Sequence, residues 1–238
     1  MMTQSDIGSS EIYKAILKSI KETLPLSQKL FKKSFTKDEA WILKKLTLRK
    51  VEVNSLEFLK YFKSLEELNL EEVTGLFNLK GLRHCPQLKT LEIYHTNIND
   101  LQAVTQCKKL TSFCYCQDPE NEHYEECKKS DFSFLKELSE LEIICIRGNK
   151  VTDVSFLAEM HTVNFLVLED NPISTIAPLK TMRNLSHLEL EFCGLSSLDD
   201  IEEFPALKTV YAEGNHFTQE QREAYLAKNP SIHIDFDN

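Results

Sequence analysis

The sequence predicts an α/β solenoid, and two observations predict it. Short segments of the form Leu-x-x-Leu-x-Leu, with apolar exchanges, recur at intervals of 22, 23, 22, 31, 22, 22 and 22 residues along the 238-residue chain. Inside each unit the spacing of apolar residues changes from two to three. Units this short cannot bury their apolar side chains alone, so stacked units must share one continuous core. The eight units begin at Leu43, Leu65, Leu88, Leu110, Leu141, Val163, Leu185 and Leu207.

Each unit is expected to hold a strand followed by a short helical turn. In the unit from Val163, Leu166 and Leu168 are two residues apart, which places both side chains on one face of a strand. The spacing of three that follows suits a 3₁₀ turn. Asn149, Asn171 and Asn215 occupy the ninth position, where an amide can bond backbone groups left unpaired after the strand.

Both ends of the repeat array carry signals of caps. Residues Ser10 to Leu24 predict a helix with one apolar stripe, and Thr36 with Glu39 has the spacing of a capping box. Thr218 and Gln221 repeat that spacing before a second helix. We therefore expect an N-terminal helical cap over 1–42, repeats over 43–217 and a C-terminal cap over 218–238, all in one structural domain. The apolar stripe is Ile12, Ile16, Leu17 and Ile20, and the closing strand contains Ile232, Ile234 and Phe236.

The fourth unit contains an insertion of about nine residues within 118–130. This segment is acidic, includes a proline and lacks apolar periodicity, so a loop is predicted. Loops on rigid scaffolds often carry function, but a surface insertion is also easily tolerated. Both interpretations stay open at this point.

The repeat resembles the leucine-rich repeat family, whose motif is L-x-x-L-x-L-x-x-N/C-x-L. The match runs from Leu43 to Phe217, and the 22-residue length is similar to internalins and to phosphatase-regulating leucine-rich repeat proteins. The resemblance implies a curved horseshoe with a parallel concave sheet and about eight repeats. It defines a shape, and a shape does not identify a ligand.

The same resemblance implies that strand positions three, five and seven point into the concave face. These positions are basic in the first unit, apolar or aromatic in the middle and acidic in the later units. Exposed aromatic residues inside a charged rim are typical of interaction hot spots. The alternative is that the apolar members pack under the caps or the insertion. The predicted partner-binding residues are Arg49, Glu71, Tyr94, Ile143, Arg147, Phe165, Val167, Glu169, Glu189, Glu191, Tyr211 and Glu213.

Charge and cysteine content limit the partners and the compartment. A net charge of -9 argues against nucleic acid and anionic membranes, so the expected partner is a protein of unknown identity. No apolar run reaches membrane-spanning length, and residues 1–10 lack the features of a signal peptide. Seven cysteines, an odd number, suggest free thiols in a reducing compartment. We expect a cytoplasmic monomer, with a secreted effector as the alternative.

The polar residues and cysteines form no known catalytic motif. The sequence has no zinc-protease, nucleophile-elbow, phosphate-loop or dinucleotide motif, so no enzyme and no cofactor are expected. Cys85 and Cys107 fill core positions, and Cys193 takes the Asn-or-Cys position of the motif.

Three further cysteines fall on strand positions. Cys114, Cys116 and Cys145 share one side of two neighbouring strands and could bind zinc together with His95 or Cys127. Small side chains also suit a crowded surface, and no Cys-x-x-Cys pair is present. The prediction is therefore that no metal is bound.

Three functions remain open at this point. The leading prediction is a protein-protein interaction scaffold that binds its partner on the concave face. The alternatives are an internalin-like secreted or surface adhesin that binds a host protein, and a regulatory subunit that recruits a phosphatase or another enzyme.

Overall fold

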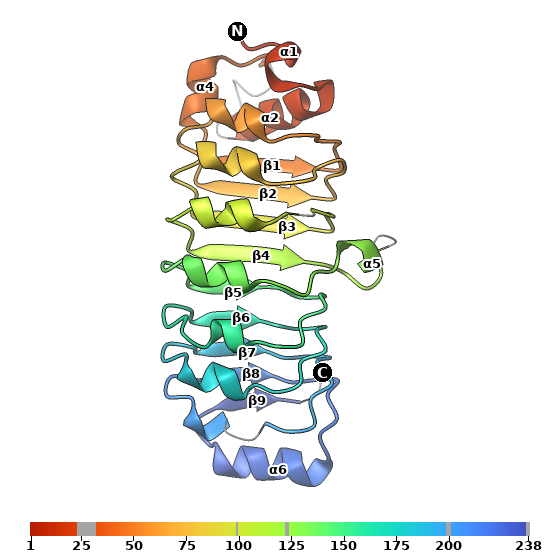
Figure 1. The fold of residues 1–238 in the computed structure, drawn as a ribbon, viewed down its shortest axis with the longest axis vertical. Coiled ribbons are helices and arrows are strands. Elements are labelled where there is room, and N and C mark those ends of the chain that lie inside the picture. Colours follow the sequence, from red (N-terminus) through yellow and green to blue (C-terminus); the bar gives the residue numbers. More distant parts are fainter. Residues whose placement is uncertain (23–31, 99, 122–123, 199–200, 237–238) are drawn as a thin grey trace. The chain divides into compact units, whose positions relative to one another are not determined.

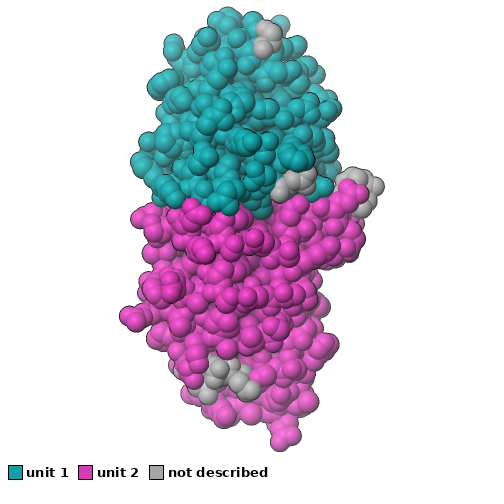
Figure 2. All heavy atoms as spheres, in the orientation of Figure 1, with its two compact units in different colours: residues 1–110 teal, residues 111–238 magenta. Residues whose placement is uncertain are grey.

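The computed structural model describes residues 1–22, 32–98, 100–121, 124–198 and 201–236. It divides into two compact units, Met1–Leu110 and Thr111–Asn238, which are described separately (Figure 2). No helix among the described residues has both the length and the apolar character that a bilayer crossing requires.

The first unit contains the N-terminal helices and three parallel strands in chain order (Figure 1). The strands pair in register, so Leu46, Leu68 and Leu91 lie side by side. The helices are α1 (Gln4–Ile7), α2 (Ser10–Glu22) and α4 (Lys37–Ile42). The strands are β1 (Lys45–Arg49), β2 (Glu67–Glu71) and β3 (Thr90–Tyr94). The 3₁₀ segments are η1 (Glu57–Tyr61), η2 (Lys80–His84) and η3 (Gln102–Gln106).

The second unit contains six parallel strands, again in chain order. The strands are β4 (Ser112–Cys116), β5 (Ile143–Cys145), β6 (Phe165–Val167), β7 (His187–Glu189), β8 (Thr209–Tyr211) and β9 (His233–Asp235). The 3₁₀ segments are η4 (Ser133–Glu137), η5 (Ser155–Leu157), η6 (Ala177–Thr181) and η7 (Ile201–Glu203). The helices are α5 (Tyr124–Cys127) and α6 (Gln219–Lys228).

The predicted alternation within each unit is confirmed. Leu166 and Leu168 are fully buried, and so is Leu179 of the 3₁₀ segment that follows. Strand and 3₁₀ segment therefore enclose the core between them, as the change of spacing from two to three predicts. The side chains at odd strand positions lie on the opposite side of the sheet, which we call the open face.

The asparagines of the ninth position form a ladder of backbone contacts, as predicted. The Asn171 amide donates to the carbonyls of Ile146 (2.9 Å) and Leu168 (2.9 Å), and its Oδ1 accepts from Val151 N–H (3.1 Å). Asn149 and Asn215 make equivalent bonds. Each amide thereby satisfies buried groups of its own repeat and of the preceding one.

The residue before this position adopts a left-handed conformation in repeat after repeat. Glycine holds it at Gly148 and Gly214, with φ of 68° and 67°. Other side chains hold it elsewhere, at a steric cost that glycine avoids. These residues are Lys50, Glu72, His95, Asp170 and Phe192.

The predicted N-terminal cap is confirmed in its helices. Helix α2 buries Ile12, Ile16 and Ile20, while Leu17 is half-buried and Leu24 lies outside the described residues. The Ser19 hydroxyl of α2 accepts a bond of 3.5 Å from the Thr47 N–H of β1. The helix thus covers an edge strand that would otherwise leave backbone groups unpaired.

Both capping boxes are also confirmed. Thr36 and Glu39 exchange reciprocal bonds at the start of α4, and Thr218 and Gln221 do so at the start of α6. The closing strand forms as β9. That the caps and the repeats make one structural domain stays a prediction.

The insertion differs from the prediction of a plain loop, because it contains the short helix α5. Burial of apolar atoms explains the difference: Cys127 is 2% exposed, and its carbonyl accepts a 2.9 Å bond from the Tyr115 hydroxyl. Lys129 N–H donates to Asn149 Oδ1 at 2.9 Å. Residues 122 and 123 lie outside the described part of the chain.

Candidate binding site

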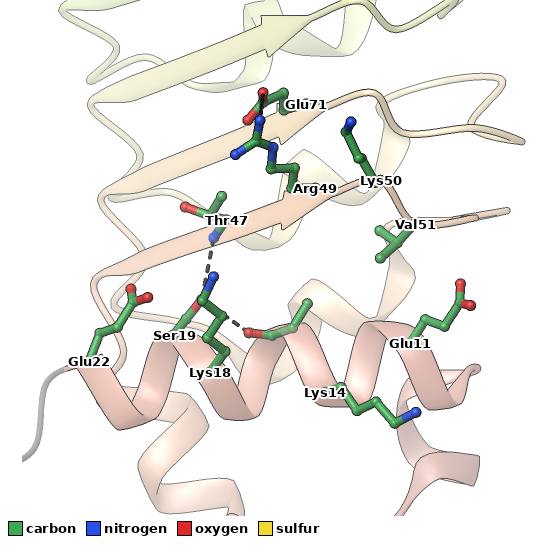
Figure 3. A pocket seen from close by; sticks show the side chains of 11 residues that line it. Glu11, Lys14, Lys18, Ser19, Glu22, Thr47, Arg49, Lys50, Val51 and Glu71 are labelled. Atoms are coloured by element: carbon green, nitrogen blue, oxygen red, sulfur yellow. Dashed lines mark hydrogen bonds and ion pairs between the residues drawn. The ribbon is translucent and has the colours of Figure 1, made fainter. Parts of the chain in front are cut away.

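The first unit has a groove between helix α2 and the open face of β1 (Figure 3). It has a volume of about 480 Å³ and is lined from the helix by Lys14, Lys18 and Glu22, and from the strands by Arg49 and Glu71. Its full lining includes four cationic side chains, among them Lys50, and three anionic ones, among them Glu11. Its lining thus favours neither sign of charge.

The basic residues of β1, and Lys50 directly after it, are neutralised by glutamates of the next repeat. Lys45, Arg49 and Lys50 each form an ion pair with the glutamate one repeat later, at 2.8, 3.1 and 3.3 Å. The pairs follow from the parallel register, which places Lys45 beside Glu67 and Arg49 beside Glu71. Exposed pairs of this kind add little stability, but they reduce the positive charge that a partner would meet.

The open face of the second unit carries a pocket with a different character. Its volume is about 320 Å³, and it combines aromatic side chains with four carboxylates. Strands β6, β7 and β8 contribute Phe165, His187 and Tyr211. The Phe165 and His187 rings stack at 4.0 Å with 13° between their planes, and His187 is 5.4 Å from Tyr211. The carboxylates are Glu189, Glu191, Glu213 and Asp235.

Three carboxylates, two of which line this pocket, lie close together. Oxygen atoms of Glu169, Glu189 and Glu191 lie within 4.8 Å of one another, close enough to share a metal ion. Burial, followed by repulsion from Glu189, Glu169 and Glu213, raises the pKa of Glu191 to about 7. Burial likewise raises the pKa of Glu169. The fold therefore disfavours the ionised form of Glu191 and Glu169.

Partners for this charge are few among the residues that the structure describes. Arg147 Nε lies 3.2 Å from Glu169 and 3.5 Å from Asp170, and His187 Nε2 lies 2.9 Å from Glu189. The buried Oε2 of Glu191 has no hydrogen-bond partner in the described part of the chain. No lysine or arginine there forms an ion pair with Glu191 or Glu213. The pocket is an anionic site that suits a cationic group.

Comparison with known proteins identifies the fold. No family model matches the sequence, and no curated protein sequence matches it. Among solved structures, internalin C2 of Listeria monocytogenes aligns with 96% of this chain and 93% of its own, with a TM-score of 0.71 and 16% identity. The protein folds as a leucine-rich repeat solenoid. At this identity the similarity concerns the fold alone.

Two further solved leucine-rich repeat structures are similar at a lower level. The internalin inlF of Listeria monocytogenes aligns with 99% of this chain and 92% of its own, at 13% identity and a TM-score of 0.48. A leucine-rich repeat protein of Leptospira interrogans aligns with 76% of this chain and 74% of its own, at 14% identity and a TM-score of 0.41.

The leucine-rich repeat register brings most predicted partner-binding residues of the second unit together. Phe165, Glu189, Glu191, Tyr211 and Glu213 line the pocket itself. Ile143, Arg147 and Glu169 lie next to it, since Ile143 pairs with Phe165 and Arg147 contacts Glu169. The structure buries Val167, which is 6% exposed between its register neighbours Cys145 and Glu189. Val167 therefore offers almost no surface to a partner.

The predicted residues of the first unit fall on a different surface. Arg49, Glu71 and Tyr94 form one row across β1, β2 and β3 of the leucine-rich repeats, and Arg49 with Glu71 lines the α2 groove. They belong to a unit separate from the anionic pocket. Whether either surface binds a partner stays a prediction.

Sequence reasoning missed several lining residues. His187 and Asp235 line the anionic pocket, and Lys14 and Lys18 line the first groove. His187 stands at position three of its leucine-rich repeat, directly beside Phe165 of the preceding repeat, and that spacing is a usable signal. The closing strand β9 extends the repeat register to Asp235, but it lies outside the motif.

Proposed function

We propose that the protein is a protein-protein interaction scaffold that receives a basic side chain of its partner in the anionic pocket of the second unit. The observation that carries this proposal is the pocket itself, where aromatic side chains and carboxylates line one cavity. The fold supports the proposal in general terms, because leucine-rich repeats present an extended open face.

Arginine is the partner residue that fits this lining best. Its planar guanidinium stacks on aromatic rings and forks two hydrogen bonds to a carboxylate. Tyr211 provides a ring, while Glu191 and Glu213 provide carboxylates beside it. A bound cation would also offset the repulsion among these glutamates.

A cytoplasmic location is part of the proposal. All seven cysteines are free thiols, which supports a reducing compartment. The fold is compatible with the adhesin and the regulatory-subunit alternatives, and no feature of the pocket favours either.

A peptide selection tests the proposed chemistry. Random peptides are selected on the immobilised wild-type protein, and the best binder is titrated into wild type and into the variant E189Q/E191Q/E213Q. We expect arginine-rich or lysine-rich peptides, and a loss of affinity of about tenfold or more in the variant, since a hydrogen bond to a charged group contributes about 1.5–3 kcal/mol.

A matched control separates the pocket from overall charge. The variant E140Q/E142Q/E159Q removes three exposed glutamates of the same unit that do not line the pocket. It should bind the peptide as the wild type does. Selected peptides without basic residues, or equal affinity for both triple variants, would contradict the proposal.

A further inference from the structure

Three cysteines meet on the open face of the second unit, and none of them lines the anionic pocket. Cys114 and Cys116 alternate on β4, and Cys145 of β5 is the register partner of Cys114. Cys116 Sγ lies 3.0 Å from Cys145 Sγ, and hydrogen bonds connect both thiols with Cys114. The parallel register therefore brings three sulfur atoms to one point.

The remaining cysteines do not take part in this group. The Cys193 thiol donates to the Leu168 carbonyl at 3.3 Å, in the place that asparagine holds in other repeats. Cys127 packs beside Tyr115, whose side chain points to the opposite side of β4 from Cys114 and Cys116. Thus Cys127, which the sequence offered as a further ligand, is on the core side.

The surroundings of the three sulfurs suit a bound ion. Cys114 is 9% exposed and Cys116 is 7% exposed, while Cys145 is partly open to solvent. A ligand can therefore arrive past Cys145 and be held out of water. The backbone N–H of Arg147 donates to the Cys145 sulfur, which favours a thiolate there.

We propose that Cys114, Cys116 and Cys145 form a binding site for one thiophilic d¹⁰ metal ion, Zn²⁺ or Cu⁺. Thiolates are the ligands that select these ions, whereas carboxylates select harder ones. Three protein ligands leave a fourth position of Zn²⁺ for water, and they complete a trigonal site for Cu⁺. This inference is independent of the proposed partner binding.

The affinity of the three cysteines for a metal ion should depend on pH. A cysteine binds either ion as a thiolate, and a thiol must lose its proton to become one. Each sulfur that binds the ion releases one proton to solvent, so affinity should rise with pH.

Metal titration of the reduced, metal-free protein tests the site. Zn²⁺ and Cu⁺ are supplied in separate experiments from chromophoric chelators, and uptake is followed by chelator absorbance. We expect one equivalent of at least one ion to be bound, more tightly at pH 8 than at pH 6. Failure to take either ion from its chelator would overturn the proposal.

Variants locate the ion. C116S/C145S should weaken binding by more than about a hundredfold, since loss of an outer-shell partner alone costs up to that factor. C193N is the matched control and should bind like the wild type, because asparagine is the usual residue at that position. Equal binding by C116S/C145S and wild type would contradict the site.

Alkylation of the wild type provides a readout that needs no variant. A maleimide is added with and without the ion, and the modified cysteines are mapped by mass spectrometry. The ion should protect Cys114, Cys116 and Cys145 relative to the metal-free protein. Protection of a different set of cysteines would overturn the assignment even if C116S/C145S fails to fold.

Discussion

The side-chain amide of Asn171 donates a 2.9 Å hydrogen bond to the carbonyl oxygen of Ile146 in the preceding repeat. The same amide bonds Leu168 within its own repeat. One buried side chain, 1% exposed, thereby joins two consecutive turns of the solenoid.

Removal of this amide should destabilise the fold strongly. Asn171→Ala leaves several buried backbone groups unpaired, and each such group costs about 1–3 kcal/mol. We expect the free energy of unfolding to fall by about 3 kcal/mol or more, measured by urea denaturation. Asn184→Ala is the control, because Asn184 is exposed and its amide donates a 2.7 Å bond to the His161 carbonyl. Similar losses in both variants would contradict the role of the ladder.

Cys193→Asn should extend the ladder. A thiol is a weak donor, and Cys193 bonds Leu168 and Glu191 at 3.3 and 3.6 Å. The amide of asparagine would replace these with stronger bonds, so we expect unfolding stability to rise by about 1 kcal/mol. Thermal denaturation measures the change. A large loss would mean that the cavity at Cys193 is too small for an amide.

The residue directly before the ninth position of most repeats has a left-handed backbone, so glycine should be favoured there. Glu72 has φ of 51°, and its ion pair with Lys50 is largely exposed. Glu72→Gly should be more stable than Glu72→Ala by about 1 kcal/mol, because only alanine retains the steric cost. At Glu71, which lies within β2, the order should reverse, because glycine weakens a strand. Chemical denaturation of the four variants decides between these outcomes.

Glu191 should make stability fall as pH rises. Its pKa in the folded protein is raised to about 7, so the folded state holds a proton that the unfolded chain has already lost above its ordinary value of 4.5. Stability from the protonated carboxyl is complete below pH 4.5 and is lost as the pH rises towards 7. Glu191→Gln removes this dependence.

The comparison is made by denaturation from pH 4 to pH 8. The difference in stability between Glu191→Gln and wild type should grow in favour of the variant as the pH rises. Glu140→Gln, an exposed control, should follow the wild type throughout. A constant difference between Glu191→Gln and wild type would show that Glu191 does not titrate in this range.

The periodic part of this fold was predictable from sequence because burial repeats with the unit. Leu166 and Asn171 each stand at a fixed position whose physical role is the same in every repeat. The left-handed position was harder to predict, because Lys50, Glu72 and Phe192 give no glycine signal there. Backbone geometry imposed by the repeat overrides local preference at these residues.

The sequence predicted which residues of the candidate site are neighbours across the strands. It did not predict how deeply their side chains are buried or which rotamers they adopt. Register alone places Phe165 next to His187 and Glu189 next to Tyr211. The burial of Val167 depends on how neighbouring side chains cover it, and the convergence of Cys116 with Cys145 depends on rotamers. Neither property is encoded in the spacing of residues.

Because each ladder asparagine bonds only its own repeat and the preceding one, the number of repeats can change without disturbing the rest of the ladder. Asn171 contacts the main chain of one preceding repeat and nothing further back. A duplicated 22-residue segment would therefore bring its own donor and find its acceptors already in place. Each duplication would widen the open face by about 4.8 Å and leave the capping helices untouched. The open face could thus be lengthened one strand at a time while its existing part is kept.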